Sequence, residues 1–79
     1  MNINRKATTI DLWYQHDGIK TWTISLCDEH GDEIRCLDAH TRHNAAWMLA
    51  CELADSYMLP AREIDVNGDV NTEYVPVQS

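Results

Sequence analysis

The sequence predicts a single α+β domain, in which one helix packs on one face of an antiparallel sheet. Three observations carry this prediction: two stretches with alternating apolar residues near the start, an amphipathic stretch that ends before a proline, and more alternating residues near the end. A chain of 79 residues supports one hydrophobic core. We expect the element order β-β-β-α-β, with a short last strand allowed, across residues 1–79, and flexible ends at 1–7 and 76–79.

The first two strands are predicted at Thr8–Tyr14 and Thr21–Cys27, where every second residue is apolar. A two-residue loop at the connection would set apolar side chains opposite polar ones. A turn with Gly18 in the left-handed conformation instead sets Leu12 opposite Trp22, so that apolar side chains meet across the pair. The second register is therefore expected.

A third strand is predicted after a similar turn around Gly31, with Ile34 opposite Leu26. The same register places Trp13 and Arg35 together on the face of the sheet that looks away from the helix. Because Trp and Arg are frequent anchors of protein interfaces, these two residues form a candidate partner-binding surface.

The helix is expected from about Arg42 to Tyr57, with Thr41 as its N-cap and Pro60 as its stop. Its apolar residues cover an arc of about 200°, which is wider than one sheet face requires. Either the terminal segments or another chain must cover the remainder. A small accessory domain that forms a homodimer through this arc is therefore the alternative function, and substitution of Trp47 would test it.

The C-terminal part is expected to form a strand at Glu63–Val66, a turn at Asn67-Gly68 and a weaker strand at Val70–Val75. Residues 65–71 also resemble the start of a dockerin-type or EF-hand calcium loop. The glycine that such a loop requires is replaced by Val70, and the closing glutamate falls on Pro76. The hairpin interpretation is therefore preferred.

No cofactor and no enzymatic activity are expected. Five potential metal ligands fall within seventeen positions: Cys27, His30, Cys36, His40 and His43. The expected register points Cys27 and Cys36 to opposite faces, and no C-x-x-C pair is present, so a metal-binding module remains only an alternative. Neither a Ser-His-Asp nor a Cys-His arrangement can be located, which speaks against nucleophilic catalysis.

The charge is strongly acidic and uneven. The formal net charge is −7, and residues 28–79 alone carry three arginines against eleven acids. Direct contact with nucleic acid or an anionic membrane is therefore not expected, whereas a basic protein surface is a natural partner. The sequence shows no signal peptide and no apolar run of about 20 residues, so we expect a cytoplasmic protein.

The acidic residues are expected to gather at one pole of the domain. If neighbouring elements alternate in direction, the second strand and the helix both end at the same side, where the last strand pair begins. Six carboxylates would then form a partner-binding pole: Asp28, Glu29, Asp32, Glu33, Asp55 and Glu63. Because clustered like charges repel one another, such a pole favours a functional role.

The run Trp22–Leu26, the Gly31 turn, Thr41–Ala54 and Ile64–Val66 together resemble the small hairpin-helix-strand proteins encoded by phages, several anti-CRISPR proteins among them. The resemblance rests on size, acidity and element order. It implies a stoichiometric inhibitor without a cofactor, acting in the host cytoplasm. Some of these proteins imitate the charge of DNA, and the resemblance implies that this chain occupies a basic surface of a nucleic-acid-handling effector complex.

Overall fold

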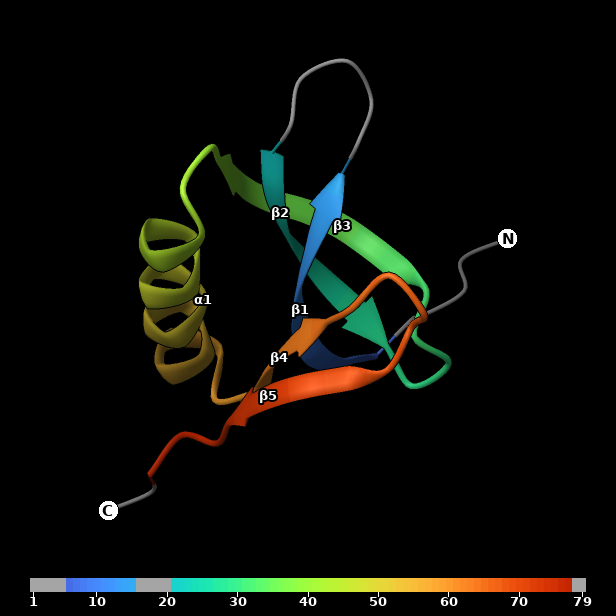
Figure 1. The fold of residues 1–79 in the computed structure, drawn as a ribbon. Coiled ribbons are helices and arrows are strands. Elements are labelled where there is room, and N and C mark those ends of the chain that lie inside the picture. Colours follow the sequence, from blue (N-terminus) through green and yellow to red (C-terminus); the bar gives the residue numbers. More distant parts are fainter. Residues whose placement is uncertain (1–5, 16–20, 78–79) are drawn as a thin grey trace.

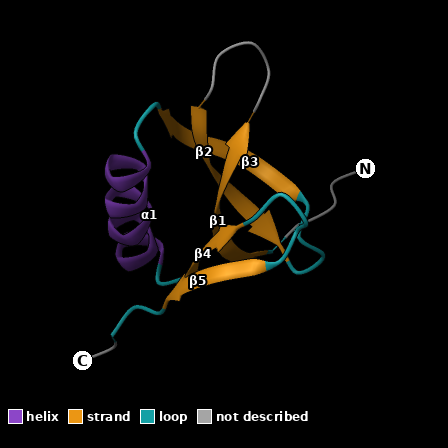
Figure 2. Ribbon diagram, viewed as in Figure 1, coloured by secondary structure: helices purple, strands orange, loops and turns teal. Residues whose placement is uncertain are grey.

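The computed structural model describes residues 6–15 and 21–77, and shows a five-stranded sheet with one helix on one face (Figures 1 and 2). The α+β prediction is confirmed, and the short last strand is present as β5. The turn expected at Gly18 and most of the expected flexible ends lie outside the described residues, although Ala7 begins the first strand. The elements are β1 (Ala7–Gln15), β2 (Thr21–Asp28), β3 (Glu33–His40), α1 (His43–Tyr57), β4 (Ala61–Ile64) and β5 (Val70–Tyr74).

The sheet is mixed, with the strand order β3-β2-β1-β4-β5. β1, β2 and β3 form the antiparallel meander that the sequence predicts, and β5 pairs antiparallel with β4. β4, however, lies parallel to β1. This arrangement arises because α1 carries the chain from the β3 edge back across one face of the sheet (Figure 1).

The register between β1 and β2 differs from the prediction by two residues. Leu12 pairs with Ile24, and Tyr14 pairs with Trp22, whereas the sequence placed Leu12 opposite Trp22. Side chains alternate between the faces with a period of two, so a slip of two residues leaves every side chain on its expected face. The apolar faces therefore match, although the partners do not.

The register between β2 and β3 changes twice, at two irregularities, and this overturns the predicted surface of Trp13 and Arg35. Leu26 pairs with Arg35 rather than with Ile34. A slip of one residue turns a side chain to the other face. The Arg35 guanidinium consequently lies on the helix side, where it donates to the Tyr57 hydroxyl at 3.4 Å.

The helix begins one residue later than expected and has a different cap. Arg42 is the N-cap residue, in an extended conformation without a side-chain hydrogen bond, so Thr41 is not the cap. The end agrees with the prediction: α1 stops at Tyr57, and Met58 takes the left-handed conformation with φ 58° just before Pro60. In the described part of the chain no helix has the length and apolar character needed to cross a bilayer.

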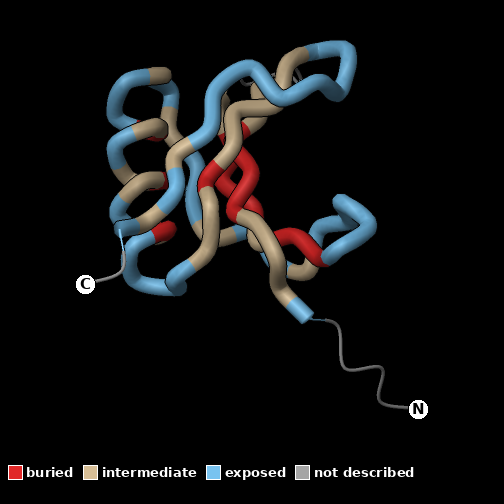
Figure 3. The backbone as a smooth tube through the Cα atoms, turned by 90° about the horizontal axis from the view of Figure 1, so that it is seen from below, coloured by how far each residue is buried: buried red, intermediate tan, exposed pale blue. Residues whose placement is uncertain are grey.

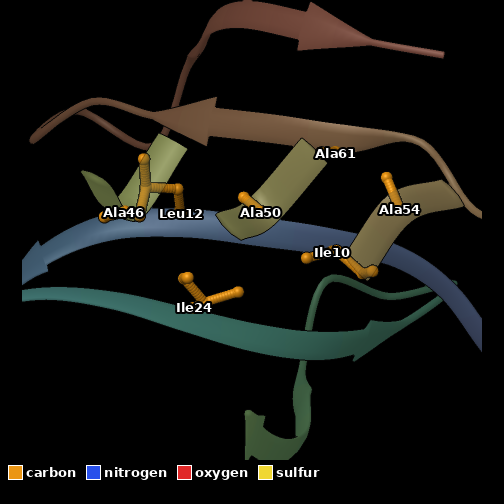
Figure 4. Packing of buried hydrophobic residues seen from close by; sticks show 7 residues of the cluster. All are labelled: Ile10, Leu12, Ile24, Ala46, Ala50, Ala54 and Ala61. Atoms are coloured by element: carbon orange, nitrogen blue, oxygen red, sulfur yellow. The ribbon is translucent and has the colours of Figure 1, made fainter. Parts of the chain in front are cut away.

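The core lies between α1 and the sheet and is made largely of small helix residues facing larger strand residues (Figure 4). Three alanines spaced four positions apart bring α1 close to the sheet. Trp47, Leu49 and Leu53 are half-buried and pack against this core, so the sheet itself covers much of the wide apolar arc. The fully buried apolar side chains are Ile10, Leu12, Ile24, Ala46, Ala50, Ala54 and Ala61.

Candidate functional site: a cleft between two acidic turns

Two turns of the structure share one sequence pattern and one hydrogen-bond pattern. Residues 28–32 and 65–69 both read D-x-x-G-D. Asp28 Oδ1 accepts the backbone N–H groups of the residues two and four positions later, at 2.9 and 3.1 Å. Asp65 Oδ1 accepts the equivalent pair, both at 2.9 Å. Each aspartate thus organises the turn that follows it.

A glycine in the left-handed conformation completes each turn. Gly31 has φ 83° and Gly68 has φ 86°, and each donates its N–H to the carbonyl of the first aspartate at 3.0 Å. L-residues with a Cβ rarely adopt this region, which explains glycine at the fourth position. The hairpin interpretation of residues 67–68 is confirmed. β4 begins two residues earlier than predicted, at Ala61. It also ends two residues earlier, at Ile64, because residues 65–69 form the turn.

The two turns lie apart on the side of the sheet away from α1, with buried segments of β1 and β2 between them (Figure 3). They border a cleft of about 630 Å³, which we call the turn cleft. Its volume falls in the range of about 300–1,000 Å³ that is typical of ligand pockets. The lining residues include Asp11, Trp13, Tyr14, Trp22, Ser25, Cys27, Gly31, Glu33, Glu63, Ile64, Asp65, Val66, Gly68 and Asn71.

The floor of the turn cleft is polar and buried, although no helix covers this side. Asp11 is only 6% exposed and receives two hydrogen bonds from the Arg62 guanidinium, both at 3.0 Å. The Asp11 hydrogen bond raises the pKa of Arg62, so the guanidinium stays charged. Burial, and next the negative charge of Asp11, raise the pKa of the Cys27 thiol to about 12. Cys27 is therefore a protonated thiol at neutral pH.

One wall of the turn cleft is held by a short chain of hydrogen bonds. The indole Nε1–H of Trp13 donates to Ser25 Oγ at 3.1 Å, and the Ser25 hydroxyl in turn donates to the Glu33 carboxylate. Ser25 is only 1% exposed, so its position is fixed by the sheet. The aromatic ring and the carboxylate are consequently both oriented before any ligand arrives.

A second wall joins the sheet to the start of the helix. The Glu63 carboxylate bonds His43 Nε2 and accepts a hydrogen bond from Asn71 Nδ2 at 3.0 Å. Burial would raise the pKa of Glu63, but the bonds from His43 and Asn71 outweigh it and lower the pKa below its usual value. Trp22 packs against the tilted ring of Tyr14 and meets the His43 ring edge-on, with centroids 4.8 and 4.6 Å away.

The structure separates the six carboxylates of the expected pole, and that prediction is wrong. Asp28, Glu29, Asp32 and Glu33 lie together in the β2–β3 turn and at the start of β3. Glu63 instead bonds His43 at the first residue of α1, whereas Asp55 accepts from the Tyr74 hydroxyl near the last turn. These two helix positions are about 18 Å apart along the axis, at about 1.5 Å per residue.

The error arises from the start of β4. Because the strand begins at Ala61, Glu63 is its third residue and lies opposite Leu12 in the middle of the sheet. Of the predicted site residues, Trp13, Glu33 and Glu63 line the turn cleft. Arg35 lies on the other face of the sheet.

Sequence reasoning missed Asp11 and Asp65 as members of a site. One signal was available: the D-x-x-G-D pattern occurs at residues 28–32 and again at 65–69, which indicates two turns of the same shape. A second signal was that Asp11 and Ser25 fall on the same predicted strand face, the one away from the helix. The structure buries both residues there.

The described lining of the turn cleft is rich in negative charge. Four carboxylates line it, namely those of Asp11, Glu33, Glu63 and Asp65. Two of them already have a basic partner within the chain, because Asp11 pairs with Arg62 and Glu63 bonds His43. Three aromatic rings accompany the carboxylates. Among the described residues, no three His, Cys, Asp or Glu side chains are placed to hold a metal ion. Chemically, the arrangement suits an organic cation better than an anion.

Comparisons of this chain with protein-family models, with curated proteins and with solved structures find no match.

Proposed function

We propose that this chain is a non-enzymatic binding protein that recognises a basic segment of a partner protein through the turn cleft. The observation that carries the proposal is the cleft itself, whose described lining combines four carboxylates with three aromatic rings and holds more carboxylates than the two that Arg62 and His43 pair with. A concave site lined by one sign of charge concentrates ligands of the opposite sign.

Two further features support a basic partner. The net charge of −7 repels phosphate-rich molecules and speeds the encounter with a positively charged surface. The carboxylates of Glu33 and Asp65 accept hydrogen bonds from their own chain, so little freedom of these side chains is lost when a partner binds.

The proposed role is that of a stoichiometric inhibitor that occupies a basic, nucleic-acid-binding surface of an effector complex. Lysine and arginine side chains that hold phosphate would be equally attracted to carboxylates. In place of the six-residue pole, exposed acidic residues of the two turns support this role. They are Glu29 and Asp32 in one turn and Asp69 in the other. The resemblance to anti-CRISPR proteins in size, acidity and element order favours the same role.

A non-enzymatic role is supported by the state of the two nucleophile-type side chains in the cleft. Ser25 and Cys27 are 1% and 4% exposed, which hinders attack on a substrate. The raised pKa of Cys27, about 12, keeps its thiol protonated at neutral pH.

Binding of a basic peptide tests the proposal with a matched pair of variants. Val66 and Val77 are both 86% exposed, but only Val66 lines the turn cleft. Val66→Lys places a positive charge at the cleft without removing a core side chain, and Val77→Lys adds the same charge elsewhere. We expect Val66→Lys to weaken binding of an Arg/Lys-rich peptide by about tenfold or more in calorimetric titration, because like charges repel. Equal affinity of both variants would refute the cleft as the site.

The inhibitor role has its own test. The wild-type protein and Val66→Lys serve as baits in cells, and any captured nucleic-acid-binding complex is then titrated against labelled DNA. We expect the wild type to displace the DNA at a one-to-one ratio and Val66→Lys to require a large excess. A captured complex that binds DNA and this protein simultaneously would contradict the inhibitor role.

A further inference from the structure

We propose that the group held in the turn cleft is an arginine side chain of the partner, in preference to a lysine. This inference rests on the proposed function, and it concerns which basic residue the cleft selects. Three features of the cleft separate the two cations: the number and placement of the carboxylates, the aromatic walls, and the largely apolar remainder of the lining.

The first feature is that carboxylates line the cleft from separate elements. Glu33 begins β3, whereas Asp65 opens the turn after β4. A guanidinium carries five N–H donors in one plane and so bonds two carboxylates at once, whereas an ammonium acts as a compact point charge. The proposed arginine places its guanidinium between Glu33 and Asp65, so that its planar donors serve both carboxylates.

The second feature is the aromatic walls. Trp13 is held by its hydrogen bond to Ser25, whereas Tyr14 and Trp22 pack against each other in a tilted arrangement at the end of the cleft next to His43. A planar guanidinium stacks on such rings and retains its in-plane donors for the carboxylates. An ammonium group has no flat face, so it contacts either a ring or a carboxylate well, but not both at once.

The third feature is the cost of dehydration. Besides the carboxylates, the cleft is lined by apolar side chains such as Ile64 and Val66. A guanidinium is more weakly hydrated than an ammonium and so loses less on leaving water. The volume of about 630 Å³ also accommodates a long side chain together with some flanking peptide.

The floor of the cleft shows that this chemistry is compatible with the fold. Asp11 and Arg62 already form a two-pronged carboxylate–guanidinium pair there, with both N–O distances at 3.0 Å and Asp11 only 6% exposed. An incoming arginine would extend this pattern toward Glu33 and Asp65.

Three blocked pentapeptides of glycine test the inference, with arginine, lysine or citrulline at the centre. Citrulline has the shape of arginine without its charge. Each peptide is titrated into the isotope-labelled protein, and the NMR signal of the Trp13 indole N–H reports binding at the cleft wall. We expect the arginine peptide to bind about tenfold more tightly than the lysine peptide, and the citrulline peptide about a hundredfold more weakly.

Glu33→Gln provides the matched variant, because a glutamine still accepts the Ser25 hydroxyl but carries no charge. We expect it to lower arginine affinity about fivefold and to reduce the preference over lysine. Glu52→Gln is the control, since Glu52 is exposed on α1 and is not among the described lining residues. It should leave the affinity within about twofold.

The outcomes separate the two proposals. Equal affinities for the arginine and lysine peptides would overturn the arginine preference and leave the basic-partner proposal standing. Citrulline binding as tightly as arginine would overturn both, because charge would then not be recognised. The absence of any shift with either basic peptide at about 10 mM would likewise overturn both.

Discussion

Asp28 and Asp65 occupy equivalent positions in two separate turns, although Asp65 follows Asp28 by 37 positions in the chain. Each uses a single carboxylate oxygen to accept two backbone N–H groups of its own turn. These carboxylates therefore shape the two turns that border the cleft. The first role of the two aspartates is structural, because they shape the turns. The negative charge that they bring to this region follows from that role.

Substitution of these aspartates by alanine should destabilise the fold. Each Asp→Ala change leaves two N–H groups without their acceptor, at a cost of about 1–3 kcal/mol. Asp28→Ala should lower the free energy of unfolding more than Asp65→Ala does, because Asp28 is 7% exposed and Asp65 is only half-buried. Chemical denaturation measures the loss. The Asp→Asn variants retain the accepting oxygen and should recover most of the stability; if they are as unstable as the alanine variants, the hydrogen-bond account is wrong.

The two turn glycines should be sensitive to alanine for a backbone reason alone. Gly31 and Gly68 have φ of 83° and 86°, and a Cβ at either would meet nothing within 4 Å. Gly→Ala should therefore cost about 1–2 kcal/mol through conformational strain and not through a clash. Asparagine tolerates the left-handed region better than alanine does, so Gly→Asn should be milder. Thermal unfolding of the four variants tests this order, and an alanine variant as stable as the wild type would contradict it.

The pair formed by His43 and Glu63 should make stability depend on pH. The pKa of Glu63 is lowered in the folded state from its usual 4.5, so its contribution is present above that value and is lost as the pH falls through the folded pKa. Glu63→Gln should flatten this part of the curve of unfolding free energy against pH. Glu52→Gln, an exposed change on α1, is the control. If Glu63→Gln and the wild type lose stability identically as the pH falls, Glu63 is not the source of this pH dependence.

The three cysteines should react with thiol reagents in a fixed order. Cys36 is exposed, Cys51 is half-buried, and Cys27 is 4% exposed with a pKa raised to about 12. Because the thiolate is the reactive form, iodoacetamide at mild alkaline pH should label Cys36 first and Cys27 last. Peptide mapping by mass spectrometry measures the rates. Denaturant should abolish the difference, and rapid native labelling of Cys27 would show that the cleft floor is open to reagents.

The sequence was sufficient for the elements but not for the pairing of the strands. Alternation of apolar residues predicted the faces of β1 and β2 correctly, because it depends only on a period of two. It could not separate registers that differ by two residues, so Leu12 was paired with Trp22 instead of Ile24. The irregularities between β2 and β3 leave no mark in the alternation, and Arg35 was consequently placed on the wrong face.

The candidate site was predictable only in pieces. Trp13, Glu33 and Glu63 were singled out for their residue type, and both glycine turns were expected where they occur. Their meeting around one cleft depends on the strand order, which places β4 beside β1 after the helix crosses the sheet. Local patterns carry no information on such contacts between distant segments. For the same reason, the predicted convergence of Asp55 with the other acids was wrong.

The row of alanines on α1 and the floor of the turn cleft lie on opposite faces of the sheet, whereas the wall formed by Glu63 and Trp22 reaches α1 at His43. Exposed turn positions other than the aspartates and glycines that shape the turns can thus vary without touching the packed layer beneath the helix, and a new preference for a binding partner there need not come at the expense of folding. A scaffold divided in this way is suited to rapid diversification, with its exposed loops varying while its interior stays constant.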